Sequence, residues 1–364
     1  MPDRDAFEHG GNLYAAARQA GRAPEAFLDF SANINPLGLS GRVRAAIEAA
    51  LPLVVHYPDA AASALKEAIA RRYVVTPEHI TCGNGAAELL YLLCYRRRPR
   101  RVLVPAPTFS EYERAARAAG AVVDYFPLTA ADGFRLDTDA LSERLAGVDI
   151  TFICNPNNPT GRILPRPAAE RIIAAAAGHG GLVVIDESFI DFLADAADHT
   201  CRPLLAAYPN LVILQSLTKF YAIPGLRLGF ALAQAPVGHL LATGKDPWNV
   251  NSLAQAAGVA ALADDEYRTA SIAAVAAARN ELAAGLAALP GVLPLPATAN
   301  FILADIAGTG HTAASLRQAL QARAILIRDC SNYPGLDDRY IRLAVKLPAD
   351  NRRLLAALEK TYCR

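Results

Sequence analysis

The stretch Ser216-Leu217-Thr218-Lys219-Phe220-Tyr221-Ala222-Ile223-Pro224-Gly225-Leu226-Arg227-Leu228-Gly229 follows the apolar run Leu211–Leu214. That run predicts a short buried strand, and Lys219 comes just after its carboxyl end. In an open α/β sheet, the residues at the carboxyl ends of the strands line the ligand crevice. A lysine amine held there can form a Schiff base with a carbonyl cofactor. The position of Lys219 therefore favours a catalytic role over that of an ordinary surface lysine.

Two side chains near Lys219 suit an anionic group. Ser216 supplies a hydroxyl and Arg227 a fixed cation, and this pair would hold a cofactor phosphate by charge-assisted hydrogen bonds. Gly225 and Gly229 bracket Arg227, and we expect both to allow close approach of the backbone.

Alternating apolar runs and helix-like stretches predict the fold class. This βαβα pattern is typical of an α/β protein with a large, mostly parallel sheet that is covered on both faces. The expected strands are Val102–Val104, Ala121–Tyr125, Ile150–Ile153, Leu182–Ile185, Leu211–Leu214 and Leu228–Leu232.

The pattern changes at about residue 251, which predicts a second, smaller α+β domain. A long alanine-rich helix is expected to about Leu289, followed by strands near Asn300–Ala304, Ile325–Ile327 and Tyr340–Val345 and a terminal helix. We assign residues 40–250 to the large domain. Residues 1–39 and 251–364 form the small domain, with an N-terminal segment that covers the substrate.

Composition favours small-molecule chemistry. The chain has 364 residues, with 36 Lys and Arg against 35 Asp and Glu, so its balanced charge does not indicate nucleic acid or an anionic membrane as partner. The run Arg96–Arg101 has no interleaved aromatic residues and is interpreted as a solvated connection. The six cysteines include no Cys-x-x-Cys pair, so no metal site is predicted. The polar start Met1–Asp5 and the lack of a long apolar stretch predict a cytoplasmic protein.

Three further motifs are each ambiguous alone. Asp186 ends the run Val183–Ile185 and could pair with a protonated ring nitrogen, or it could be a helix cap or a solvated acid. Asn155–Gly161 follows a strand and could be only a turn. Gly83–Glu88 opens a helix whose free N–H groups could receive a phosphate, although two glycines are a weak signal.

Taken together and in order, these motifs resemble the fold-type I, aspartate-aminotransferase-like family of pyridoxal-phosphate enzymes, over nearly the whole chain. The resemblance implies that Lys219 bonds covalently to pyridoxal 5'-phosphate and that the protein is a homodimer. It also implies one cofactor contact for each of several residues: Ser216, Arg227, Gly85 and Ala86 at the phosphate, Asp186 at the ring nitrogen, Asn158 at the ring hydroxyl, Phe109 stacked on the ring, and Tyr57 reaching the phosphate of the neighbouring subunit.

Within that family, the chain is similar to histidinol-phosphate aminotransferases and, more closely, to L-threonine-O-3-phosphate decarboxylases of cobalamin biosynthesis. The decarboxylase pattern appears in His9–Asn12, Asp29–Pro36 and Ile325–Leu336, and in Phe189, where aminotransferases usually carry tyrosine. This resemblance implies loss of carbon dioxide from L-threonine O-3-phosphate to give (R)-1-aminopropan-2-yl phosphate. The implied substrate contacts are His9, Gly10, Asn33, Asn158, Arg328 and Arg342.

Other functions stay open at this point. A histidinol-phosphate aminotransferase would share the fold, the cofactor and a phosphorylated substrate. A non-catalytic pyridoxal-phosphate-binding regulatory domain is the alternative from a different class. His9 could also be an ordinary histidine near the terminus, and Asn33 a turn former before Pro36.

Overall fold

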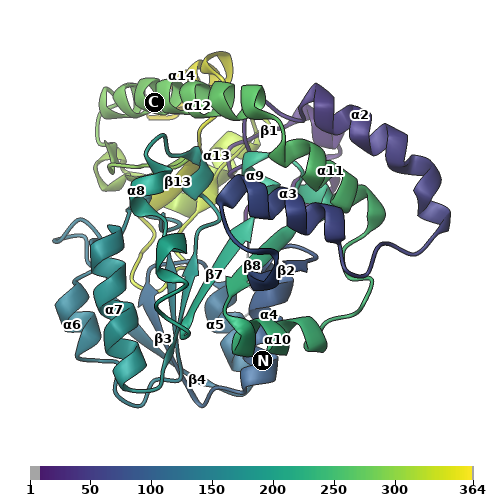
Figure 1. Cartoon of the computed structure of the whole chain (residues 1–364). Coiled ribbons are helices and arrows are strands. Elements are labelled where there is room, and N and C mark those ends of the chain that lie inside the picture. Colours follow the sequence, from purple (N-terminus) through teal and green to yellow (C-terminus); the bar gives the residue numbers. More distant parts are fainter. Residues whose placement is uncertain (1–8, 363–364) are drawn as a thin grey trace.

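A seven-stranded sheet lies at the centre of the computed structural model, which describes residues 9–362 (Figure 1). The segment Met1–Asp5 and Cys363 lie outside the described residues. The strand order is β2-β8-β7-β6-β5-β3-β4, and β8 alone runs antiparallel to its neighbours. The strands are β2 (Ile80–Gly83), β3 (Arg101–Ala106), β4 (Val122–Pro127), β5 (Ile150–Cys154), β6 (Leu182–Asp186), β7 (Leu211–Ser216) and β8 (Gly229–Ala233).

Helices cover both faces of this sheet because its strands are apolar on both sides. Val184 belongs to the hydrophobic cluster that includes α4 (Ala86–Arg97), α5 (Glu111–Ala118) and α10 (Ala235–Gly244). Its neighbours Val183 and Ile185 belong to the cluster that includes α6 (Thr138–Ser142) and α7 (Arg166–Gly178). Figure 1 shows α6 and α7 on one side of the sheet and α4, α5 and α10 on the other.

The C-terminal part forms a second layered unit. Its antiparallel sheet has the order β12-β13-β10-β9, from β9 (Leu293–Pro294), β10 (Phe301–Asp305), β12 (Arg328–Asp329) and β13 (Tyr340–Ala344). Residues of α12 (Asp265–Ala287), α13 (Ala313–Gln321) and α14 (Pro348–Tyr362) share its core. A separate parallel pair joins β1 (Leu28–Asp29) to β11 (Ile325–Leu326), so the N-terminal part packs against the C-terminal unit.

Shorter elements complete the chain. The other α-helices are α1 (Leu13–Ala20), α2 (Gly41–Ala50), α3 (Ser63–Tyr73), α8 (Ala196–His199), α9 (Leu217–Phe220) and α11 (Ser252–Leu262). The 3₁₀ turns are Pro24–Ala26, Leu51–Val55, Pro77–His79, Ile190–Phe192, Arg202–Leu204, Pro224–Leu226 and Ala307–Thr309.

The predicted strands of the large sheet are confirmed within one or two residues at each end, and the α/β class with them. Five details are corrected. β1, β2 and β9 were missed, because each is short and offers too few residues for a periodic pattern. The single long helix is two helices, because α11 ends at Leu262 and a new helix starts after Asp264. The Asp264 carboxylate accepts from the N–H of Tyr267 at 3.1 Å and so caps the start of α12. The strand expected at Ile325–Ile327 is split between β11 and β12, which belong to different sheets.

The domain boundary near residue 250 stays a prediction. Helix α11, just after it, packs against α2 and α3 beside the large sheet, whereas α12 packs against α14 (Figure 1).

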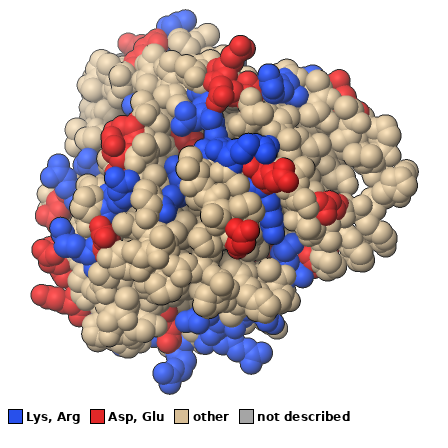
Figure 2. All heavy atoms as spheres, in the orientation of Figure 1, with Lys and Arg blue, Asp and Glu red and all other residues tan. Residues whose placement is uncertain are grey.

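The face of the molecule seen in Figure 2 agrees with the balanced charge of the chain. Figure 2 shows acidic and basic side chains interspersed over this face. The part of the molecule that projects at the right of the picture carries few charged side chains. None of the helices in residues 9–362 is long and apolar enough to cross a membrane.

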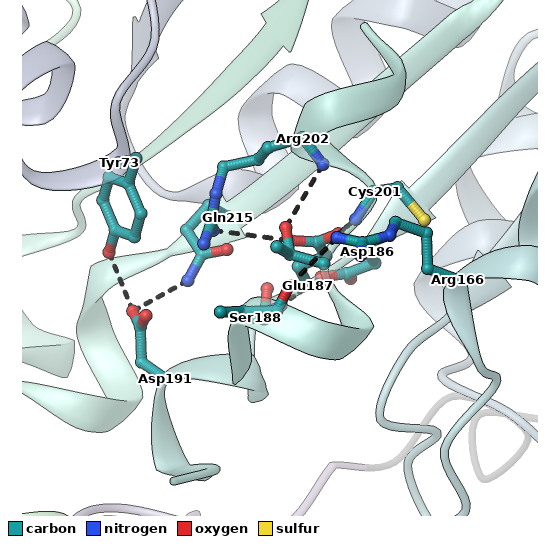
Figure 3. Close-up of polar contacts among 11 residues, drawn as sticks. Tyr73, Arg166, Asp186, Glu187, Ser188, Asp191, Cys201, Arg202 and Gln215 are labelled. Atoms are coloured by element: carbon teal, nitrogen blue, oxygen red, sulfur yellow. Dashed lines mark hydrogen bonds and ion pairs between the residues drawn. The ribbon is translucent and has the colours of Figure 1, made fainter. Parts of the chain in front are cut away.

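A buried polar cluster lies behind the end of β6 (Figure 3). Glu187 is fully buried. Its carboxylate accepts from the Thr200 hydroxyl at 2.7 Å and from the Cys201 N–H at 2.6 Å. The same carboxylate lies 3.5 Å from the Arg202 guanidinium. Beside it, the carboxylate of Asp191 accepts from the Tyr73 hydroxyl at 2.8 Å. These contacts tie the chain after β6 to residues 200–202 and to α3, and so hold the strand end that carries Asp186.

We predict that Glu187→Ala lowers the free energy of unfolding by about 3 kcal/mol, because it leaves the Arg202 charge and two buried donors without their partner. Urea unfolding followed by circular dichroism measures the change. Asp195→Ala, which removes an exposed pair with His199, should cost less than about 1 kcal/mol. Equal losses in the two variants would mean that the buried cluster does not stabilise the fold.

Candidate active site

A cavity of about 370 Å³ opens at the carboxyl ends of the parallel strands, where the topology of the sheet predicts a ligand site. Most of the residues singled out in the sequence line it. They are His9, Gly10, Asn33, Ala86, Phe109, Asn158, Asp186, Ser216, Lys219, Arg227 and Arg342.

Lys219 is presented by the short helix α9, which Ser216 caps. The Ser216 hydroxyl accepts from the N–H of Thr218 at 3.4 Å and lies 2.7 Å from its hydroxyl oxygen. Burial lowers the pKa of Lys219 to about 8, and the nearby charges of Arg342 and Arg227 contribute while that of Asp186 opposes. A neutral amine, which is the nucleophilic form, is therefore available near neutral pH.

Arg227 lies directly against the start of α4. A side chain at Gly85, whose φ is +83°, would come within 2.5 Å of the Arg227 guanidinium, and one at Gly229 within 2.5 Å of the Ala86 nitrogen. The close approach expected at Gly229 is therefore present. The same expectation for Gly225 is wrong, because nothing lies within 4 Å of the place of its missing side chain.

Asp186 is buried at the end of the central strand β6. Its carboxylate accepts from the Tyr112 hydroxyl at 2.7 Å and from the Ser188 N–H at 2.9 Å. Burial raises the pKa of Asp186, although these hydrogen bonds and Lys219 oppose the shift. A cation placed against this carboxylate would therefore be strongly favoured. Tyr112 had no assigned role in the sequence, because no local pattern links it to Asp186, which is 74 positions away.

Arg342 reaches the cavity from β13. Its guanidinium donates to the side-chain oxygen of Asn158 and to the Ser31 carbonyl, the latter at 2.7 Å. Two buried polar atoms here, Nε of Arg342 and Oδ1 of Asn33, have no partner among the described residues. Buried polar groups are normally paired, so these two atoms fit a cavity that receives a polar ligand.

The N-terminal segment closes one side of the cavity. Gly10 packs so tightly that a Cβ there would lie 2.0 Å from the Ser31 carbonyl oxygen, and the Gly11 N–H donates to the Ser31 hydroxyl at 2.7 Å. His9 then reaches Glu111, with 2.6 Å between its Nε2 and the carboxylate. Glu111 is a second cavity residue to which the sequence analysis gave no role.

Three predicted site residues lie outside the lining of the cavity. Gly85 is beneath Arg227, as described above. Tyr57 is 77% exposed and stacks on Trp248 with 4.3 Å between ring centroids. Arg328 is buried opposite Arg342 in the β12–β13 pairing, and its guanidinium lies 5.1 Å from the centre of the Tyr333 ring, which does line the cavity.

Comparison with known proteins finds relatives over nearly the whole chain. The family model described as aminotransferase class I and II matches residues 25–358. The chain is 39% identical to the threonine-phosphate decarboxylase of Salmonella typhimurium, over 96% of this chain and 95% of that one.

Solved structures show the same fold. The L-threonine-O-3-phosphate decarboxylase from Porphyromonas gingivalis superposes with a TM-score of 0.82 at 30% identity, covering 92% of this chain and 99% of that one. The histidinol-phosphate aminotransferase from Clostridium acetobutylicum has a TM-score of 0.87 at 28% identity, with the same coverage of 92% and 99%.

We predict that Gly229→Ala destabilises the fold by about 1–3 kcal/mol, because the new methyl group meets backbone atoms of α4 and β7 that cannot move independently. Gly225→Ala, only four positions away and in open space, should change the unfolding free energy by less than about 1 kcal/mol. Urea unfolding of both variants tests the difference. Equal behaviour of the two would show that β8 and α4 are not in close contact.

We also predict that the amine of Lys219 reacts with acetic anhydride in a pH-dependent way whose midpoint is about 8. Since the Arg342 charge disfavours the ammonium form, Arg342→Gln should move that midpoint upward. Competitive labelling of the cofactor-free protein followed by peptide mass spectrometry measures the midpoint, with the exposed Lys360 as an internal reference. A midpoint that does not respond to Arg342→Gln would contradict the electrostatic coupling of the two residues.

Proposed function

Because the chain belongs to the class I and II aminotransferase family, we propose that it is a pyridoxal-phosphate-dependent decarboxylase of L-threonine O-3-phosphate. The products are (R)-1-aminopropan-2-yl phosphate and carbon dioxide, and the former supplies the aminopropanol side arm of cobalamin. The observation that carries this proposal is the docking of the N-terminal segment, which brings His9 into the same cavity as Lys219.

The residues of the cavity fit pyridoxal 5'-phosphate. When bound, pyridoxal phosphate stabilises the negative charge that develops on the substrate α carbon as a bond to that carbon breaks. The amine of Lys219 supplies the covalent attachment point, and Asp186 pairs with the ring nitrogen. Ser216, Arg227 and the N–H groups at the start of α4 bind the phosphate. Asn158 takes the ring hydroxyl and Phe109 the ring face.

The chain grips both ends of the substrate. Arg342, held by Asn158 and Ser31, presents a preoriented guanidinium of the kind that binds carboxylates in a bidentate manner. We assign the substrate phosphate to His9 and Asn33 in the cavity, and to Arg328, which lies outside the lining but against the lining residue Tyr333. Holding two remote anionic groups would fix the orientation of the substrate α carbon in the cavity, and this orientation would select loss of carbon dioxide over loss of a proton.

Lys219 then returns a proton to the α carbon. Its pKa of about 8 means that both the amine and the ammonium forms are populated near neutral pH, so the same group serves as nucleophile and as proton donor.

Phe189 favours the decarboxylase over the histidinol-phosphate aminotransferase. It lines the cavity and packs edge to face on Phe301 with 5.0 Å between ring centroids, so this position offers no hydroxyl.

The proposal includes a homodimer in which Tyr57 reaches the cofactor phosphate of the neighbouring subunit. Tyr57 is exposed and outside the cavity of its own chain, and it follows a run of exposed apolar residues, Leu51, Leu53, Val54 and Val55. Such a run on a projecting segment is typical of an interface between subunits. We also assign the enzyme to the cytoplasm.

We predict that the purified protein, supplied with pyridoxal phosphate, releases carbon dioxide from L-threonine O-3-phosphate without a keto acid. Lys219→Ala should abolish release, because the covalent attachment point and the proton donor are lost together. Carbon dioxide and 2-oxoglutarate consumption are measured in parallel, with histidinol phosphate as the second substrate. Rapid amino transfer from histidinol phosphate, without carbon dioxide from threonine phosphate, would establish the aminotransferase instead, and inactivity with both would favour the non-catalytic domain.

A further inference from the structure

The contact between His9 and Glu111 joins two distant parts of the cavity wall. Nε2 of His9 lies 2.6 Å from Oε1 of Glu111. His9 belongs to the segment that is docked on Ser31, whereas Glu111 begins α5 beside the large sheet. The imidazole is partly exposed, with 40% of the side chain accessible, while that of Glu111 is 10% accessible.

Other contacts hold the Glu111 carboxylate in place. The Tyr91 hydroxyl donates to Oε2 at 2.6 Å, and the Arg114 guanidinium lies 3.4 Å from Oε1. Burial raises the pKa of Glu111, but the hydrogen bonds from His9 and Tyr91 and the charges of His9 and Arg114 outweigh burial and leave that pKa below its usual value. Glu111 is therefore a carboxylate of defined orientation at neutral pH.

This orientation decides what His9 offers to the cavity. Because Nε2 faces the carboxylate, Nδ1 is the ring nitrogen that is left for a ligand. In a neutral ring protonated at Nε2, Nδ1 carries a lone pair, which an anionic phosphate oxygen cannot use. In the imidazolium, Nδ1–H is a charged donor, and a phosphate oxygen can accept from it.

We propose that Glu111 is a positioning residue for recognition of the substrate phosphate: it holds the His9 ring through Nε2–H so that Nδ1–H is presented to a phosphate oxygen. The inference rests on the proposed function in one respect, since it takes the phosphorylated end of the substrate to lie at His9.

The kinetic test uses Glu111→Gln in the holoenzyme. We expect kcat/KM for L-threonine O-3-phosphate to fall about tenfold, the scale of one charge-assisted hydrogen bond, because the ring loses its charged partner. The value for unphosphorylated L-threonine should change less than about twofold, whereas a general structural defect would lower both. Glu113→Gln is the matched control, since Glu113 lies on the same helix and pairs with Arg117 instead. An equal loss for both substrates would overturn the proposal.

A double-mutant comparison tests whether Glu111 acts through His9. In a His9→Asn background, Glu111→Gln should lower kcat/KM for L-threonine O-3-phosphate by less than about a further twofold, because the ring that Glu111 positions is absent. If the loss of kcat/KM in the double variant instead equals the product of the two single losses, Glu111 acts independently of His9 and the assignment is overturned.

The ¹⁵N resonances of the His9 imidazole give a readout that does not depend on activity. They are assigned by their absence in His9→Asn and are followed against added inorganic phosphate. Glu111→Gln should weaken their response to phosphate, because the contact that orients the ring is changed. Tyr91→Phe, which removes only the hydrogen bond to Oε2, should act in the same direction but less strongly.

The two experiments separate the two hypotheses. If the resonances respond as expected but no carbon dioxide is released from L-threonine O-3-phosphate, the proposed function fails and the role of Glu111 stands. If the resonances are the same in Glu111→Gln and in the unsubstituted protein, the role of Glu111 fails whatever the reaction is.

Discussion

The parallel pairing of β5, β6 and β7 is the constraint on which the site depends. In the register of the sheet, Cys154 is opposite Asp186 and Asp186 is opposite Leu214. Three strands therefore end at one edge, and each delivers the start of a different functional segment there. Lys219, Asp186 and Asn158 meet because of this register, although they are far apart along the chain. Behind the edge, the contacts of Glu187 and Asp191 hold the end of β6 (Figure 3).

The charges in the cavity are unequal, and this imbalance suits anionic ligands. Arg227 and Arg342 both lower the pKa of Lys219, whereas Asp186 alone opposes them. Two guanidinium groups that face a buried amine repel it, and an anion placed between them would relieve the repulsion. The arrangement thus keeps the amine reactive and attracts phosphate or carboxylate groups by the same electrostatic effect.

The N-terminal segment adds His9 and Gly10 to the lining of a cavity that the large sheet builds. Its position depends on the absence of a side chain at Gly10, where the backbone lies against Ser31, and on the Glu111 carboxylate across the cavity. Ser31 also accepts from Arg342, so one residue contacts both the segment and the guanidinium assigned to the substrate carboxylate. The two ends of the proposed substrate grip are therefore mechanically connected.

The sequence alone determined the α/β class and all but one of the parallel strands of the large sheet, and it identified the polar residues at the strand ends that line the cavity, because apolar periodicity and strand-end residues are local signals. It could not supply the contacts that complete the site. Tyr112 meets Asp186 across 74 positions, and His9 meets Glu111 across 102, so neither contact has a local signal. The glycines show the same limit: Gly225 and Gly229 look alike in the sequence, yet only Gly229 lies against another backbone. Tertiary packing decided these features, because it alone brings α4, α5 and the N-terminal segment against the strand ends.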